Sequence, residues 1–96
     1  MYFRITIPSL QDGKKDEAIS FVKEKVMPEF DGTPGLLTMM AAITGETSGI
    51  NIAAYESKEH LEASQNEFNE LMVNMMPYMA GPPEVSFGEG VFSFNS

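Results

Sequence analysis

The order in which two hydrophobic periods follow one another constrains the fold of this chain more than any other feature. Residues 1–7 alternate apolar and polar side chains, which is the period of a half-buried strand. Residues 14–27 repeat apolar side chains every three or four positions, as a surface helix does. Ser57 is predicted to cap a second helix, which has the same spacing. Three more segments read as strands: residues 36–44, 50–56 and 85–94. The predicted order is therefore strand, helix, strand, strand, helix, strand.

This order is typical of the ferredoxin-like βαββαβ fold, an α+β architecture in which both helices cover one face of a four-stranded antiparallel sheet. The 96 residues fit a single domain over 1–96. One element has an alternative, because the run Met39 to Ala42 also suits a helix. Its length and the turn-forming residues 45–49 favour a strand that leads into a hairpin.

Two helices on one face leave the other face of such a sheet without a cover. We expect the apolar side chains of Tyr2, Tyr55, Phe92 and Phe94 on that face, which is too much exposed apolar surface for a stable monomer. The prediction is a homodimer, the dimeric α/β barrel, with the two sheets packed face to face around a cavity.

Charge and composition exclude several classes of function. Fourteen acidic against six basic residues give a net charge of −8, which argues against nucleic acid and against an anionic membrane surface as partners. No run approaches the roughly 18 apolar residues of a membrane span, and the start MYFRITIP is unlike a signal peptide, so we expect a cytoplasmic protein. Without cysteine, and with His60 as the only histidine, we predict neither a thiolate centre nor a histidine-rich metal site.

Three stretches of the chain resemble a known family. The first is Thr33-Pro34-Gly35-Leu36, before the second predicted strand. The second is the run Ala54 to Glu59, in which an aromatic residue at a strand end is followed by a serine and an acidic residue that open a helix. The third is the apolar last strand. In these respects the chain is similar to the antibiotic biosynthesis monooxygenase-like domains of the dimeric α/β-barrel superfamily. The resemblance implies a monooxygenase-like homodimer that acts, without a metal or other cofactor, on a small aromatic or quinone-type molecule.

Two positions depart from that family. Tyr55 stands at the strand end where active relatives often carry tryptophan, and Ser64 stands where many carry a histidine, one turn after His60. These departures argue against a haem-degrading enzyme. They keep two alternatives open, since a fold does not fix a reaction: a non-catalytic small-molecule-binding or stress-associated protein, and a proton-transfer isomerase or cyclase.

Arg4 is the only arginine and the first candidate for a functional residue. It lies in the middle of the first strand, and its planar guanidinium could hold a carboxylate or an enolate oxygen in the cavity. The structural alternative is an ion pair with a glutamate of a neighbouring strand: Glu56, Glu84 or Glu89.

Four further residues complete the predicted site. Tyr2 and Tyr55 share the face of Arg4 and would bind the substrate, while Asn51 on the same face would join Arg4 in catalysis. His60, in the first turn of the second helix, would act as a general base. The alternatives are tyrosines that fill a dimer interface and a histidine exposed to solvent.

Overall fold

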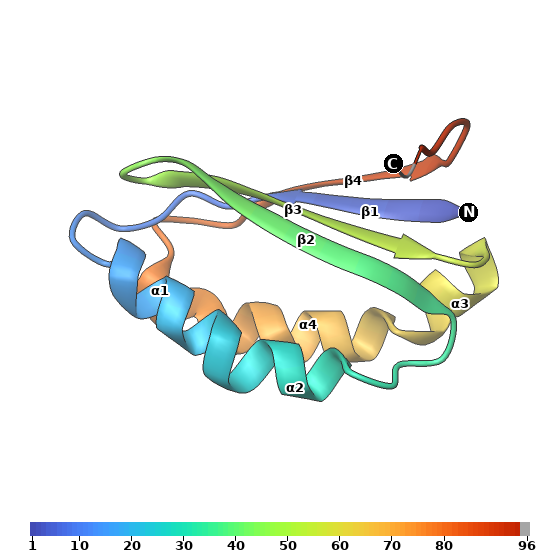
Figure 1. Cartoon of the computed structure of the whole chain (residues 1–96). Coiled ribbons are helices and arrows are strands. Elements are labelled where there is room, and N and C mark those ends of the chain that lie inside the picture. The colour runs from blue at the N-terminus through green and yellow to red at the C-terminus, as the bar shows by residue number, and fades with distance from the viewer. Residues whose placement is uncertain (95–96) are drawn as a thin grey trace.

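The computed structural model describes residues 1–94, which form a four-stranded antiparallel sheet with two helical arms on one side (Figure 1). The strands are β1 (Tyr2–Ile7), β2 (Leu36–Gly45), β3 (Ser48–Tyr55) and β4 (Glu84–Glu89), in the order β2-β3-β1-β4. The first arm contains α1 (Lys15–Phe21), the π-helical η1 (Val22–Val26) and α2 (Met27–Phe30). The second contains α3 (Lys58–Ala63), α4 (Gln65–Met75) and the 3₁₀ turn η2 (Met76–Tyr78). The predicted ferredoxin-like α+β fold is confirmed.

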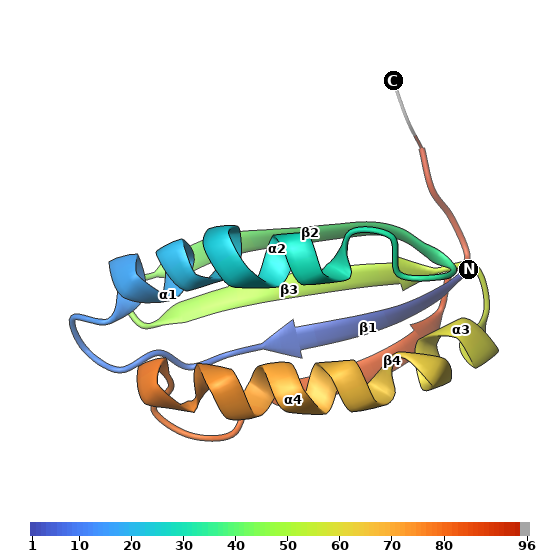
Figure 2. The ribbon, with the colours of Figure 1, turned by 90° about the horizontal axis from the view of Figure 1, so that it is seen from below.

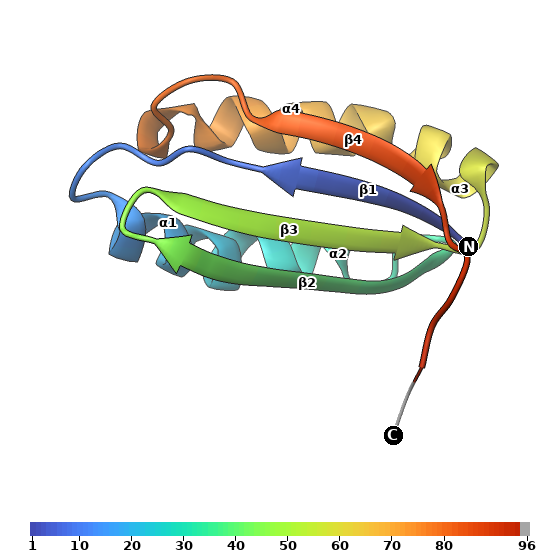
Figure 3. The ribbon, with the colours of Figure 1, turned by 90° about the horizontal axis from the view of Figure 1, so that it is seen from above.

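The two arms divide the covered face between them. Seen from below, the α1–α2 arm runs along β2 and β3, while α4 runs along β1 and β4 (Figure 2). Seen from above, the other face of the sheet carries no helix (Figure 3). Within the described residues, no helix is both long and apolar enough to cross a membrane.

The predicted strand over residues 36–44 is confirmed as β2, and the helical alternative for it is wrong. It joins β3 through the two residues Glu46 and Thr47, inside the turn that the sequence indicated. The first helix continues to Phe30, three residues beyond the predicted end, and Pro28 lies in its last turn as expected. The second is interrupted at Ser64, where φ is −91° and ψ is 0°.

The last strand is shorter than predicted. It ends at Glu89, which pairs with Tyr2 at the start of β1, and only one more bond follows, from the Gly90 N–H to the Met1 carbonyl at 2.7 Å. Residues 91–94, the rest of the described chain, belong to no strand. The side chains that were expected on the sheet, Phe92 and Phe94, are instead 78% and 77% exposed on this terminal segment.

The strand register corrects one further prediction. Tyr2 lies opposite Tyr55, Arg4 opposite Ala53 and Thr6 opposite Asn51, so these side chains share one face of the sheet. Tyr55 is fully buried and packs with Leu61 of α3, which makes this the face that the helices cover. The expectation that it faces a cavity between two sheets is wrong, because alternation sorts side chains into two faces without saying which face the helices will cover.

The open face is defined here as the face without helices. It carries the alternate residues of the same strands, among them Phe3, Ile5 and Ile7 of β1, Ile52 of β3 and Met40 of β2. Ile5, Ile52 and Met40 lie side by side across three strands, since each is the cross-strand neighbour of the next. The row is therefore an apolar strip across the sheet.

Candidate functional site

Arg4 is the centre of a polar cluster beneath the helices, although only 2% of the residue is exposed. Its Nη1 donates to the Tyr55 hydroxyl at 3.3 Å, and its Nη2 donates to Oε1 of Gln65 at 3.1 Å and to Oγ of Ser64 at 3.5 Å. The guanidinium carbon lies 4.1 Å from the ring centroid of Phe68 and 5.6 Å from that of Tyr55. These five residues are called the Arg4 cluster below.

Elements distant in the sequence build this cluster. Arg4 comes from the middle of β1, Tyr55 from the end of β3, and Ser64, Gln65 and Phe68 from the break between α3 and α4 and the turn after it. The break places Ser64 over the end of β3, with its hydroxyl 2.9 Å from that of Tyr55. The two positions at which the sequence departs from the resembling family are thus in direct contact with each other and with Arg4.

The protons of the two hydroxyls can be assigned from their partners. Ser64 donates to the Leu61 carbonyl at 2.8 Å, so its oxygen is free to accept from Tyr55. The Tyr55 oxygen, in turn, accepts from Arg4. This arrangement satisfies every hydroxyl of the cluster and leaves both oxygens as acceptors toward the cation.

No carboxylate neutralises Arg4 within residues 1–94, because none of the ion pairs in this range includes it. The predicted alternative of an ion pair with Glu56, Glu84 or Glu89 is therefore wrong. A guanidinium removed from water and bonded only to neutral acceptors is energetically costly. Contact with the faces of aromatic rings offsets a part of that cost.

Two buried polar atoms beside the cluster have no hydrogen-bond partner among the described residues. They are Nε of Arg4 and Oγ1 of Thr6. Both side chains lie on the helix-covered face of β1, two residues and therefore roughly 7 Å apart along the strand. Two buried polar atoms without a hydrogen-bond partner on neighbouring positions of one strand are unusual, because buried polar groups of proteins are seldom left unpaired.

His60 lies apart from the cluster. Its Nδ1 is 2.7 Å from Oγ of Ser57, its Nε2 is 3.9 Å from a carboxylate oxygen of Glu56, and its ring packs against Gly35. In the described part of the chain, no side-chain hydrogen bond links the imidazole to Arg4, Tyr55 or Ser64. The structure brings Arg4 and Tyr55 together, but it does not bring His60 to them.

The remaining predicted residues share the face of Arg4, as the alternation indicated. Tyr2 lies opposite Tyr55 and packs against the buried cluster that contains Tyr55 and Leu61. Asn51 lies opposite Thr6. Tyr2 and Asn51 are both half-buried. Sequence reasoning missed Gln65, Phe68 and Thr6 as neighbours of Arg4. No local signal could have found the first two, because helical spacing does not say which strand residue a helix will meet.

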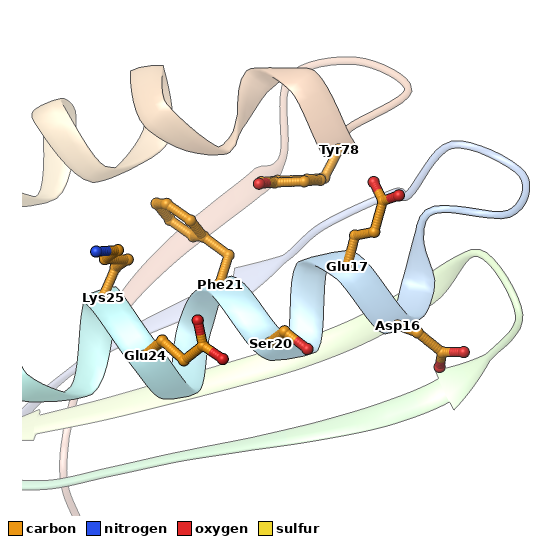
Figure 4. A pocket seen from close by; sticks show the side chains of 7 residues that line it. All are labelled: Asp16, Glu17, Ser20, Phe21, Glu24, Lys25 and Tyr78. Carbon is orange, nitrogen blue, oxygen red and sulfur yellow. The ribbon is translucent and has the colours of Figure 1, made fainter.

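Two surface grooves lie elsewhere on the molecule. The first is an open groove of about 480 Å³ between the α1–η1 segment and η2, where the ring centroids of Phe21 and Tyr78 are 5.5 Å apart (Figure 4). The second, of about 380 Å³, is an apolar groove between the end of α4 and residues 80–83. Arg4 lines neither groove. Among the residues that the structure describes, no three histidine, aspartate or glutamate side chains gather as a metal site would require.

Comparisons with known proteins identify the fold. The sequence matches no family model and no curated protein. The structure is similar to that of a monooxygenase from the gene ActVA-Orf6 of Streptomyces coelicolor in complex with nanaomycin D, with a TM-score of 0.79 and 16% identity over 99% of this chain and 91% of that one.

Two other solved structures give the same result. A mutant of SnoaB, a cofactor-independent oxygenase from Streptomyces nogalater, matches with a TM-score of 0.80 and 11% identity over 99% of this chain and 97% of that one. NE2512, a protein of unknown function from Nitrosomonas europaea, matches with a TM-score of 0.85 and 15% identity over 99% and 93%. The chain therefore has the fold of the antibiotic biosynthesis monooxygenase-like proteins, which it also resembles in its sequence motifs.

Proposed function

We propose that this protein is a cofactor-independent monooxygenase-like protein that acts on a small aromatic or quinone-type molecule at the Arg4 cluster. The observation that carries the proposal is a buried guanidinium with neutral hydrogen-bond partners and two aromatic neighbours. Such a cation stabilises the negative charge on the oxygen of a phenolate or enolate, the form of substrate that gives an electron to dioxygen. The oxygenases that share the fold support this choice.

The reaction balances for a hydroxyanthrone, a ring ketone with an acidic methylene group. The methylene group loses one proton to water, and the resulting enolate reacts with dioxygen; one oxygen atom becomes a new ring carbonyl, and the other leaves as water with the second methylene hydrogen and one proton from the solvent. Arg4 would hold the enolate oxygen, and Tyr2 and Asn51, on the same face, would contact the rings.

Oxygen consumption tests the proposal. We expect the wild-type protein to consume one dioxygen per hydroxyanthrone, and Arg4→Met to lower the rate about 100-fold, as the loss of one oxyanion donor does elsewhere. Lys23→Met is the matched control, since it removes an exposed cation away from the cluster. An equal rate in the wild type and in Arg4→Met would refute the assignment of Arg4. His60→Gln in the same assay tests the general base.

A binding function without catalysis is the second candidate, and one observation favours it. Apart from Arg4, the cluster consists of hydroxyl, amide and aromatic groups, and it contains no carboxylate or imidazole to accept a proton. The same feature disfavours a proton-transfer isomerase or cyclase. Binding of the hydroxyanthrone under air, without oxygen consumption, would support the second candidate.

We also propose that the protein forms a homodimer through the open face. Ile7 and Met40 of this face are 42% and 61% exposed, and Ile5 and Ile52 lie beside Met40 in the apolar strip. The chain after β4 turns to the same side of the sheet, away from the helices (Figure 1). Because the Arg4 cluster lies on the opposite face, this dimer would leave the cluster outside its interface.

A further inference from the structure

Three methionines line the second groove, away from the Arg4 cluster. Met72 lies in the last turn of α4, Met76 is the first residue of η2, and Met79 directly follows η2. Met72 and Met76 are four residues apart, which is the spacing of neighbours on one face of a helix. The Met79 N–H donates to the Met76 carbonyl at 3.2 Å, so η2 brings the third methionine close to the second. The three residues therefore form a row at the end of this arm.

The rest of the groove is apolar and offers no competing side-chain ligand. After η2 the chain loops back to β4, and residues 80–83 of this loop form the other wall (Figure 2). The Ala80 N–H already donates to the Ser9 carbonyl at 2.8 Å, and Pro82 and Pro83 have no N–H. All other lining residues are valine, alanine, glycine or proline, so the methionine sulfurs are the only side-chain heteroatoms around this space of about 380 Å³.

The position of each methionine separates packing from access. Met75 belongs to the buried core with Leu10 and Ala18 and does not line the groove, so packing accounts for it. Met79 is 8% exposed and forms the inner end of the row. Met76 is 64% exposed, so an ion from solvent can reach the outer end.

The donor set selects the kind of ligand. A thioether is a neutral, polarisable and weak acceptor, and it suits soft ions such as Cu(I) better than Mg²⁺ or Ca²⁺. The net charge of −8 attracts cations to the molecule as a whole. The chain has no cysteine to compete for such an ion, and within residues 1–94 no three imidazole or carboxylate groups gather to hold a harder metal.

We propose that this groove binds one soft monovalent metal ion, Cu(I) or its analogue Ag(I), through the thioether sulfurs of Met72, Met76 and Met79. Methionine side chains are unbranched and turn about three bonds, which lets the three sulfurs converge on one ion. The site is separate from the proposed function, because Arg4 does not line the groove and no step of the oxygenase reaction uses it. The ion stays monovalent, so binding needs no oxidant or reductant.

The methionine methyl groups provide a direct test. The chain has eight methionines, so protein labelled with ¹³C at these methyl groups gives eight signals in a ¹H–¹³C correlation spectrum. In a chloride-free buffer, we expect one equivalent of silver nitrate to shift three signals, which Met→Leu variants at positions 72, 76 and 79 assign. Cu(I), added under argon as its acetonitrile complex, should shift the same three, and zinc nitrate should shift none of them.

A matched pair of variants measures the contribution of one sulfur. Met76→Leu should weaken silver binding at least tenfold, followed on the Met72 and Met79 methyl signals, because leucine keeps the apolar volume and removes one ligand. Met27→Leu is the control and should bind silver like the wild type, since Met27 lies in α2 of the other arm and is 59% exposed, close to Met76. The metal-free spectrum of each variant checks that the fold is kept.

The same measurements can overturn the inference. Silver that leaves the spectrum unchanged would do so, as would equal shifts of Met27 and Met40, because these exposed methionines lie outside the groove. Equal silver affinity in the wild type and in Met76→Leu would also refute the assigned ligands. None of these results depends on whether the protein consumes oxygen, so the proposed function stands or fails separately.

Discussion

At the scale of the residue, one buried cation, Arg4, lies at the centre of the proposed site. Arg4 gains hydrogen bonds and ring contacts, but it gives up the water around a full charge for neutral partners. Replacement of buried charged groups by apolar side chains of similar volume is often neutral or stabilising. The binding role proposed above would account for a charge that is buried at such a cost.

Arg4→Met should therefore leave the free energy of unfolding unchanged or raise it by about 1–2 kcal/mol. The bond between Tyr55 and Ser64 remains, and methionine fills the space beside Phe68. Urea unfolding of this variant, with Lys23→Met as the exposed control, measures the change. A loss of more than about 3 kcal/mol would show that Arg4 is held for stability instead.

Gly35 leaves room for the imidazole ring of His60, which packs against it. Its φ is +76°, and a Cβ atom there would overlap the imidazole ring. Its carbonyl accepts from the Glu56 N–H at 2.8 Å, which ties the start of β2 to the end of β3.

We predict that Gly35→Ala lowers the free energy of unfolding by about 2–4 kcal/mol, from left-handed strain and from displacement of His60. Gly13→Ala is the control for strain alone, because φ is +78° there and no described atom lies within 4 Å of the new Cβ. It should cost about 1 kcal/mol. Equal losses in chemical denaturation would mean that the ring moves aside freely.

At the scale of the element, the start of α3 fixes the direction of the second arm. Oγ of Ser57 accepts from the His60 N–H at 3.2 Å, which is the helix cap that the sequence predicted. Seven residues after Ser57, the break at Ser64 redirects the helix and places Ser64, Gln65 and Phe68 around Arg4. A weakened cap would thus affect the site through the position of this arm.

Ser57→Ala should destabilise the protein by about 1 kcal/mol, the usual effect of a lost serine cap. Ser20→Ala, at an exposed position inside α1, should change stability by less than about 0.5 kcal/mol. The midpoints of thermal unfolding of the two variants, recorded side by side, make the comparison. If both variants unfold like the wild type, the cap of α3 carries no stability.

At the scale of the whole molecule, the two faces of the sheet differ, because the helices cover only one of them. One face and the helices enclose the Arg4 cluster, while the open face presents an apolar strip to its surroundings. Exposed apolar patches of this kind mark association surfaces. The proposed ligand site and the proposed dimer interface are therefore on opposite sides of one sheet.

We expect Met40→Lys to convert the proposed dimer into a monomer, because a lysine in the apolar strip would be desolvated at the interface. Val73→Lys is a close control, since Val73 of α4 is 63% exposed and Met40 is 61% exposed. Light scattering during gel filtration should give twice the 10.6 kDa of one chain for the wild type and the control. A dimeric Met40→Lys variant would exclude the open face as the interface.

The sequence by itself determined the order of the elements, the hairpin between β2 and β3, the cap at Ser57 and the common face of Tyr2, Arg4, Asn51 and Tyr55. These features follow from periods and turn residues that act over a few neighbouring positions. The end of the last strand did not follow from its local pattern. It lies at Glu89 because pairing with Tyr2 of the distant strand β1 ends there.

Only the tertiary structure decided which face the helices cover and what Arg4 contacts. The hydrogen bonds of its guanidinium span 51, 60 and 61 residues of sequence, to Tyr55, Ser64 and Gln65. No local pattern encodes such a meeting, because it depends on the side of the sheet on which the second arm packs and on where that arm bends. For the same reason the two unpartnered atoms of β1, Nε of Arg4 and Oγ1 of Thr6, became visible only in three dimensions.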